Sequence, residues 1–184
     1  MKIDRDSIKV FTCHNDTSRF KSIVTELTVN ASLEKLTKFV LDIPAYVTWQ
    51  YNTVEAKTIK KISDTEQIYR TVVRAPWPIT DRDMVVHIEI TMDPDHQGMQ
   101  IVTASERGIF PDQPGLVRVP VSRALWTVKQ KKESKLTIRY VMQIDPGGSV
   151  PAWLANWVCA NAPYLSFKKL KEKLEAEITP PVSR

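Results

Sequence analysis

The sequence predicts an α+β protein in which one long C-terminal helix lies across the concave side of an antiparallel sheet. Before Asp145, apolar and polar residues alternate in short runs, which is typical of half-buried strands. After the turn at 145–148, the spacing becomes helical and charged residues gather on one side. The apolar positions of this predicted helix are Val150, Leu154, Trp157, Val158, Leu165 and Leu170, and the charged ones are Lys168, Lys169, Glu172, Lys173 and Glu175.

A chain of 184 residues that is 42% hydrophobic can bury the core of one domain, so residues 1–184 are predicted to form a single domain. The net charge of +5 is spread over strand ends and turns, and no phosphate loop or aromatic-basic pattern accompanies it. We therefore expect no nucleic-acid partner. The residues from Met1 to Arg5 lack the apolar region of a signal peptide, which favours a soluble, cytoplasmic protein.

The strands and helices can be placed in order. Ile8–Cys13 and residues 20–29 are predicted to be strands at one edge of the sheet. A helix with Leu33 and Leu36 on its apolar stripe follows, and then a short helical turn that carries Tyr46 and Trp49. Further strands are predicted at 54–62, 67–73, 83–92, 99–105, 118–129 and 136–144.

Alternation also assigns a face to most strands. Met84, Val86 and Ile88 share the apolar face of their strand, and the inward set chosen on the preceding strand excludes Arg70 and Arg74, because burying an unpaired charge is costly. For residues 119–128, the sequence does not decide which alternate set of side chains faces inward. The residues predicted to contact a ligand in the enclosed space are Tyr69, Thr71, Val73, Met84, Val86, Ile88, Tyr140, Met142, Leu154 and Val158.

Three unusual connections should emerge at one end of an up-and-down sheet, at 74–82, 106–117 and 145–150. Prolines stiffen the first two connections, yet both place large apolar side chains where polar residues are the norm. This pattern predicts the mouth of a cavity or an apolar contact patch. The predicted gate residues are Trp77, Pro78, Phe110 and Trp153. Alternatively, Trp77 and Phe110 plug the end of the core.

Three features together resemble the START (steroidogenic acute regulatory related lipid-transfer) domains. These are Trp49, the stretch from Ala75 to Val85, and the stretch from Asp145 to Asn156 followed by Leu170. The resemblance implies a helix-grip fold, in which a curved antiparallel sheet wraps around the C-terminal helix and encloses a hydrophobic cavity for one lipid. It also implies that residues 75–82 and the helix start form the gate.

The resemblance does not name the lipid. Some sterol-binding members of the START family carry a buried pair of opposite charges, and Tyr69 and Ile88 occupy the matching positions here. The implied partners are a lipid or other hydrophobic small molecule and, transiently, a membrane surface.

Little in the sequence indicates catalysis, and we expect no catalytic residue, cofactor or metal. His87 is predicted to face outward, His96 lies in a turn with two aspartates, and His14 lies in an N-terminal turn. The charges at 81–83 are interpreted as an arginine-carboxylate clamp between loop and strand. Cys13 and Cys159 are expected to be buried thiols, although a disulfide remains open. The alternative function is a cyclase- or hydratase-like enzyme, which would need a titratable group inside the same cavity.

Overall fold

The computed structural model describes residues 2–13, 22–132, 134–150 and 152–176. The side chains at 2, 13, 152–157, 159 and 160 fall outside this description. The predictions made for Trp153 and Leu154, for the pairing of Cys13 with Cys159, and for His14 therefore lie outside the described residues.

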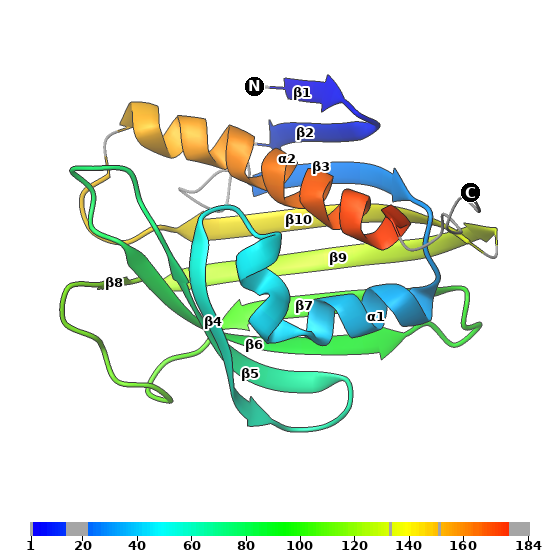
Figure 1. Ribbon diagram of the computed structural model, residues 1–184, viewed down its shortest axis with the longest axis horizontal. Helices are drawn as coiled ribbons and strands as arrows, with labels where there is room; N and C mark the ends of the chain where they lie inside the picture. Colours follow the sequence, from blue (N-terminus) through cyan, green and yellow to red (C-terminus); the bar gives the residue numbers. More distant parts are fainter. Residues whose placement is uncertain (1, 14–21, 133, 151, 177–184) are drawn as a thin grey trace, which may run out of the picture.

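The described strands form one curved, open sheet of ten strands (Figure 1). Its order is β1-β2-β3-β10-β9-β7-β6-β5-β4, all neighbours on this path are antiparallel, and β8 pairs in parallel with β6. The predicted helix-grip fold and the meander from β4 to β10 are confirmed. The strands are β1 Lys2–Arg5, β2 Ile8–Cys13, β3 Ser22–Val29, β4 Thr53–Lys61, β5 Glu66–Val73, β6 Arg82–Met92, β7 Gly98–Ser105, β8 Val117–Arg118, β9 Val121–Lys132 and β10 Lys135–Asp145.

Strand β1 was not predicted from the sequence. It is joined to β2 by a tight turn in which Asp6 and Ser7 both have positive φ, at 57° and 60°. The four residues of β1 include three charged side chains, so they show no apolar alternation that could mark a strand. The strand is defined by its ladder with β2, which runs from Lys2 opposite Phe11 to Arg5 opposite Ile8.

Two α-helices and a 3-10 helix lie against the sheet. Helix α1, Leu33–Leu41, begins where Ser32 Oγ accepts a hydrogen bond from the Lys35 amide at 3.1 Å, and it buries Leu33, Leu36 and Val40. The 3-10 helix η1, Ile43–Thr48, buries Tyr46. Helix α2, Ala152–Ala176, is the long C-terminal helix, and none of the described helices is long and apolar enough to cross a membrane.

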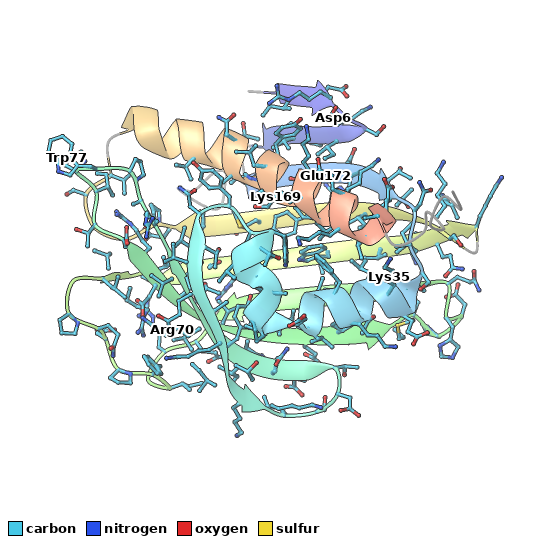
Figure 2. The ribbon with its side chains drawn as sticks, viewed as in Figure 1. Asp6, Lys35, Arg70, Trp77, Lys169 and Glu172 are labelled. Atoms are coloured by element: carbon cyan, nitrogen blue, oxygen red, sulfur yellow. The ribbon has the colours of Figure 1, made fainter. Side chains whose placement is uncertain are left out.

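The second half of α2 is amphipathic and packed. Tyr164, Phe167, Leu170 and Leu174 are buried, whereas Lys169 and Glu172 point away from the sheet in Figure 2. The end of the helix is fixed by Lys35 Nζ, which donates to the Leu174 carbonyl at 2.7 Å, and by Lys171 Nζ, which donates to the Thr28 carbonyl at 3.0 Å.

The first half of α2 differs in composition. No Asp, Glu, Lys, Arg or His occurs between Pro146 and Phe167, so this stretch has no charged side to match that of the second half. The predicted two-sided pattern therefore holds only after Phe167. Pro163 lies inside the helix and cannot donate the backbone hydrogen bond of its turn.

Candidate functional site

The inner face of the sheet, the side that packs against α2, is filled at one end by large side chains. Cross-strand register places Ile90, Ile101, Trp126 and Tyr140 side by side on this face. Phe167 of α2 packs on Trp126 and on Tyr140, with ring centroids 5.0 Å apart in both cases. This end is a close-packed core.

Toward the other end the same face carries small or half-buried side chains. Ile88, Thr103, Ala124 and Met142 follow one another across β6, β7, β9 and β10. Ser105 lies opposite Val86 in the next row, and its Oγ accepts a hydrogen bond from the Ser122 amide at 3.1 Å. We call this region the open half. Its inward residues that keep partial exposure are Val73, Met84, Thr103, Ser105, Ser122, Met142 and Ile144.

Several of these residues were not predicted from the sequence to line the inner face. Thr103, Ser105, Ser122 and Ala124 give the open half its floor, yet none is apolar and large enough to mark a buried face. Their small volume contrasts with the bulky side chains of the neighbouring rows, such as Ile101 and Trp126.

Three tyrosines border the open half, of which Tyr46 and Tyr69 are buried and Tyr140 is half-buried. Tyr46 packs edge-on against Tyr69, with ring centroids 5.4 Å apart, and its hydroxyl donates to the Val40 carbonyl at 2.6 Å. Burial raises the pKa of Tyr46, Tyr69 and Tyr140, and mutual repulsion between the phenolate forms adds to the effect on Tyr46 and Tyr140. All three phenols are therefore protonated and neutral at physiological pH.

Among the residues that the structure describes, four buried side-chain polar atoms have no hydrogen-bond partner: Thr25 Oγ1, Trp49 Nε1, Thr53 Oγ1 and Thr71 Oγ1. Thr71 lies opposite Met84, Thr53 lies opposite Val73 and Thr25 lies opposite Tyr140, so all three threonines are on the inner face. Buried hydroxyls normally have a partner, so each unpaired one can donate a hydrogen bond to, or accept one from, a water or a ligand group.

The predicted ligand contacts divide between the two regions. Thr71, Val73, Met84, Val86 and Met142 border the open half, together with Tyr69 and Tyr140. Ile88 is fully buried beside Thr103, at the boundary with the packed core. Val158 is half-buried on α2. The structure thus brings the described members of the predicted set to one face, and their contact with a ligand stays a prediction.

The three predicted connections do meet at one end. The Val117 amide donates to the Asp81 carbonyl at 2.9 Å, which joins the 106–117 connection to the 74–82 loop. Gly147, with φ of 66°, lies so close to Pro120 and Arg118 that a Cβ there would stand 3.0 Å from Pro120 Cδ and 3.1 Å from the Arg118 carbonyl oxygen.

Trp77 lies at the tip of the β5–β6 loop (Figure 2), and its side chain is 93% exposed. The loop is closed at its base, where Asp81 Oδ1 accepts a hydrogen bond from the Ala75 amide at 2.9 Å. Pro78, which follows a cis peptide bond, is exposed as well. Trp77 does not plug the core, so that alternative is wrong for this residue.

Phe110 lies on the opposite face of the sheet. Its ring covers the guanidinium of Arg70, 5.0 Å from the ring centroid, and lies 5.3 Å from Lys57 Nζ. Arg70 is 4% exposed on the outer face, where Arg70 Nε donates to Asp83 Oδ2 at 3.0 Å. Placing Phe110 at the gate was therefore a wrong prediction, because the 106–117 connection folds beneath the sheet instead of over the mouth.

The predicted charge clamp exists but uses other arginines. Asp83, 1% exposed, accepts hydrogen bonds from Arg70 and also from Arg118, with Arg118 Nε 2.8 Å from Asp83 Oδ1. Arg118 also donates to the carbonyls of Phe110 and Pro111, both at 3.1 Å. Arg82 instead donates to the Thr80 carbonyl.

The comparisons with known proteins agree with this architecture. The START domain family model matches residues 1–177. The chain belongs to the START domain family. An uncharacterized protein of Pseudomonas aeruginosa is 27% identical over 172 residues, covering 94% of this chain and 84% of the relative. Mouse phosphatidylcholine transfer protein is 28% identical over 131 residues, covering 68% of this chain and 59% of its own length.

Solved structures resemble this START domain over most of its length. A STAR-related lipid transfer protein fragment from Xanthomonas axonopodis superposes with a TM-score of 0.86 and 27% identity, covering 95% of this chain and 98% of the fragment. The Zhui aromatase/cyclase from a Streptomyces species has a TM-score of 0.65 at 10% identity, covering 90% and 100% of the two chains, and shares the fold alone.

The histidines of this START domain have ordinary surroundings where they are described. His87 Nε2 is 2.7 Å from Glu66 Oε1 on the outer face, and His96 lies in the β6–β7 turn, where its amide donates to the Asp93 carbonyl at 2.9 Å. Within the described ranges, no three His, Cys, Asp or Glu side chains come together as metal ligands do. His87 therefore does not serve the inner face.

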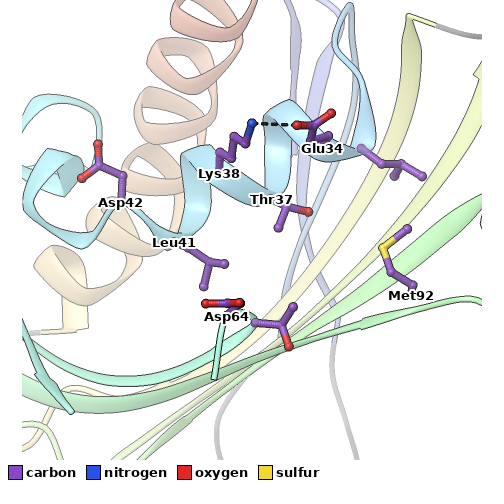
Figure 3. A pocket seen from close by; sticks show the side chains of 9 residues that line it. Glu34, Thr37, Lys38, Leu41, Asp42, Asp64 and Met92 are labelled. Carbon is purple, nitrogen blue, oxygen red and sulfur yellow. Dashed lines mark hydrogen bonds and ion pairs between the residues drawn. The ribbon is translucent and has the colours of Figure 1, made fainter. Parts of the chain in front are cut away.

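A surface groove of about 670 Å³ lies between α1 and the β4–β5 turn (Figure 3). Its charged rim includes a 2.6 Å ion pair between Lys38 Nζ and Glu34 Oε1. None of the residues predicted to contact a ligand lines it, so the groove is separate from the open half. The lining residues are Leu33, Glu34, Thr37, Lys38, Leu41, Asp42, Asp64, Thr65 and Met92.

The contrast between Phe110 and Trp77 can be tested by substitution. Phe110→Ala is expected to lower the free energy of unfolding by about 1–2 kcal/mol, because it removes the ring from Arg70. Trp77→Ala should change it by less than about 0.5 kcal/mol, since the side chain is exposed. Urea unfolding of both variants measures the difference. Equal destabilisation by the two substitutions would contradict this assignment.

Proposed function

We propose that this START domain binds one lipid or other hydrophobic molecule in its open half and transfers it after transient contact with a membrane surface. The observation that carries the proposal is the contrast along the inner face. Large side chains fill one end, whereas small and half-buried ones line the other. A cavity for one such ligand typically measures on the order of 300 to 1,000 Å³.

Apolar burial supplies the driving force for such binding, at about 25 cal/mol per Å² of apolar surface. Val86, Met84 and Met142 offer that surface, while Thr71 and the bordering tyrosines offer oxygen atoms that set the orientation of the ligand. The relatives support the assignment, because mouse phosphatidylcholine transfer protein and the Xanthomonas protein are both named for lipid transfer.

A cyclase- or hydratase-like enzyme is the alternative function. General acid-base catalysis needs a group that exchanges a proton near neutral pH. On the described inner face of the open half the titratable groups are the tyrosines, and burial moves the pKa of Tyr69 and Tyr140 away from neutrality. This favours a carrier over an enzyme.

Two measurements test the proposed function. Native mass spectrometry of protein purified from its own cell should show a retained hydrophobic molecule in a 1:1 complex. Purified protein should also speed the movement of a fluorescent lipid between donor and acceptor vesicles. If neither occurs in folded protein, the proposed function is wrong. Chemical conversion of the retained molecule during incubation would favour the enzyme instead.

Filling the open half should remove binding without harming the fold. Ala124→Leu adds bulk to the floor, and we expect ligand retention to fall by at least about tenfold, while the thermal midpoint stays the same or rises. Thr127→Leu, three residues farther along β9 and on the outer face, is the matched control and should retain ligand. If Ala124 were instead closely packed, the added volume would cost about 1–3 kcal/mol of stability.

A further inference from the structure

We propose that the part of the ligand held in the open half is uncharged and carries a hydroxyl, ester or ketone oxygen that hydrogen-bonds to Thr71. The proposal rests on the proposed function and narrows it to neutral lipids, such as diacylglycerols or long-chain alcohols, rather than phospholipids or fatty acids. Three observations carry it.

The first observation is the scarcity of charge around the open half. The described inward positions near it are Thr, Ser, Ala, Val, Ile, Met, Tyr and Gln, except for Arg82 at the start of β6. In addition, the chain has no charged residue between Pro146 and Phe167. The buried charges Arg70 and Asp83 lie on the outer face and bond to each other. A phosphate or carboxylate in the open half would thus lose its hydration without gaining a counter-charge.

The second observation is the set of unpartnered hydroxyls. Thr71 is 1% exposed, its Oγ1 has no hydrogen-bond partner, and it lies opposite Met84 in the open half. Thr53 Oγ1 is also unpartnered and belongs to the neighbouring pair with Val73. A threonine hydroxyl can both donate and accept, so an alcohol or an ester carbonyl satisfies it without a charge.

The third observation is the state of the neighbouring phenols. Burial raises the pKa of Tyr69 and Tyr140, so both present a neutral O–H group. The Tyr140 hydroxyl donates to Met142 Sδ at 2.9 Å, a weak acceptor that a ligand oxygen can replace. Both phenols therefore match an uncharged oxygen better than a cation or an anion.

Arg82 is the charged side chain nearest to this region by register, since it lies opposite Val73 where β6 begins. Its guanidinium donates to the Thr80 carbonyl and thus lies at the rim, toward the gate loop. An anionic group could reach it only from outside the open half, which gives the experiment a defined competing outcome.

The experiment compares lipids with identical chains. Displacement of a fluorescent diacylglycerol from the protein is measured with dioleoylglycerol and with dioleoylphosphatidic acid, which differ by the phosphate. Dioleoylglycerol is expected to compete at least about tenfold better. Thr71→Val should weaken dioleoylglycerol binding by about fivefold, whereas Thr127→Val on the outer face should leave it unchanged.

Equal or better competition by phosphatidic acid would overturn the inference and leave the proposed function standing. The same holds if Thr71→Val, shown to be folded by its thermal midpoint, binds dioleoylglycerol as well as the parent does. Loss of phosphatidic acid binding in Arg82→Gln would place an anion site at the rim and also count against the inference. If no lipid binds at all, both the inference and the proposed function fail.

Discussion

Asp83→Asn is expected to lower the free energy of unfolding by about 3 kcal/mol, because it removes the buried carboxylate partner of Arg70 and leaves that guanidinium paired with the more exposed Glu55, at 2.9 Å. Asp83 binds Arg70 and Arg118 together, and Arg118 in turn holds the carbonyls of Phe110 and Pro111. The substitution should therefore also loosen the 106–117 connection. Limited proteolysis within this connection would then be faster than in the parent protein.

The pH dependence follows from the direction of the pKa shift. Burial on its own would raise the pKa of Asp83, but hydrogen bonds from Arg118 and Arg70 outweigh it and hold the pKa below its usual range. A carboxyl whose pKa is lower in the folded state contributes stability above its unfolded pKa of about 4 and loses that contribution as pH falls through the folded value.

Urea unfolding at pH 7 and at about pH 3 measures this effect. The parent protein should be more stable than Asp83→Asn at pH 7, and the difference should shrink at the lower pH. Asp112→Asn is the matched control, because this exposed carboxylate also pairs with Arg118, at 3.3 Å. The Asp112→Asn substitution should lower the free energy of unfolding by less than about 1 kcal/mol. A difference between parent and Asp83→Asn that does not change with pH would contradict the assigned ion pair.

The sequence predicted the elements whose apolar pattern matches their burial. Met84, Val86 and Ile88 recur at every second position, and the structure places all three on the inner face although Val85 between them is also apolar. The pattern failed in β9 for a physical reason. Ser122 and Ala124 face inward but are small, whereas Leu125 faces outward at 39% exposure, so the apolar residues alone give no clear face. The ambiguity thus arises where the open half requires small side chains.

The local sequence did not indicate that charged residues would be buried on the outer face. Arg70 and Asp83 sit at outward positions of β5 and β6, where exposure is the usual expectation for charged residues. They are buried because the 106–117 connection, distant in sequence, passes beneath the sheet and brings Phe110 and Arg118 to them. A contact of this kind depends on the path of a long loop, and proline or aromatic content does not show which face that loop will cover.

A disulfide between the Trp77 loop and the start of α2 is expected to slow ligand exchange by at least about tenfold, since a lipid cannot cross a complete backbone ladder and needs a movable segment. The loop is suited to move, because Pro76 and Pro78 lack amide donors and Trp77 is exposed. Its hydrogen bond from Ala75 to Asp81 holds the base. Gly147 and Gly148 adopt positive φ before the helix and provide a turn on the other side of the predicted mouth.

The experiment replaces Cys13 and Cys159 with serine and then places one cysteine between 76 and 79 and another between 149 and 154. Pairs that oxidise fully satisfy the distance needed for a disulfide and can be used for transfer assays. Oxidation should stop exchange between vesicles and retain lipid already bound, and reduction should restore exchange. Each single-cysteine variant under the same oxidant is the control. Unchanged exchange in fully crosslinked protein would show that the ligand enters elsewhere, because the loop and the helix start could then no longer separate.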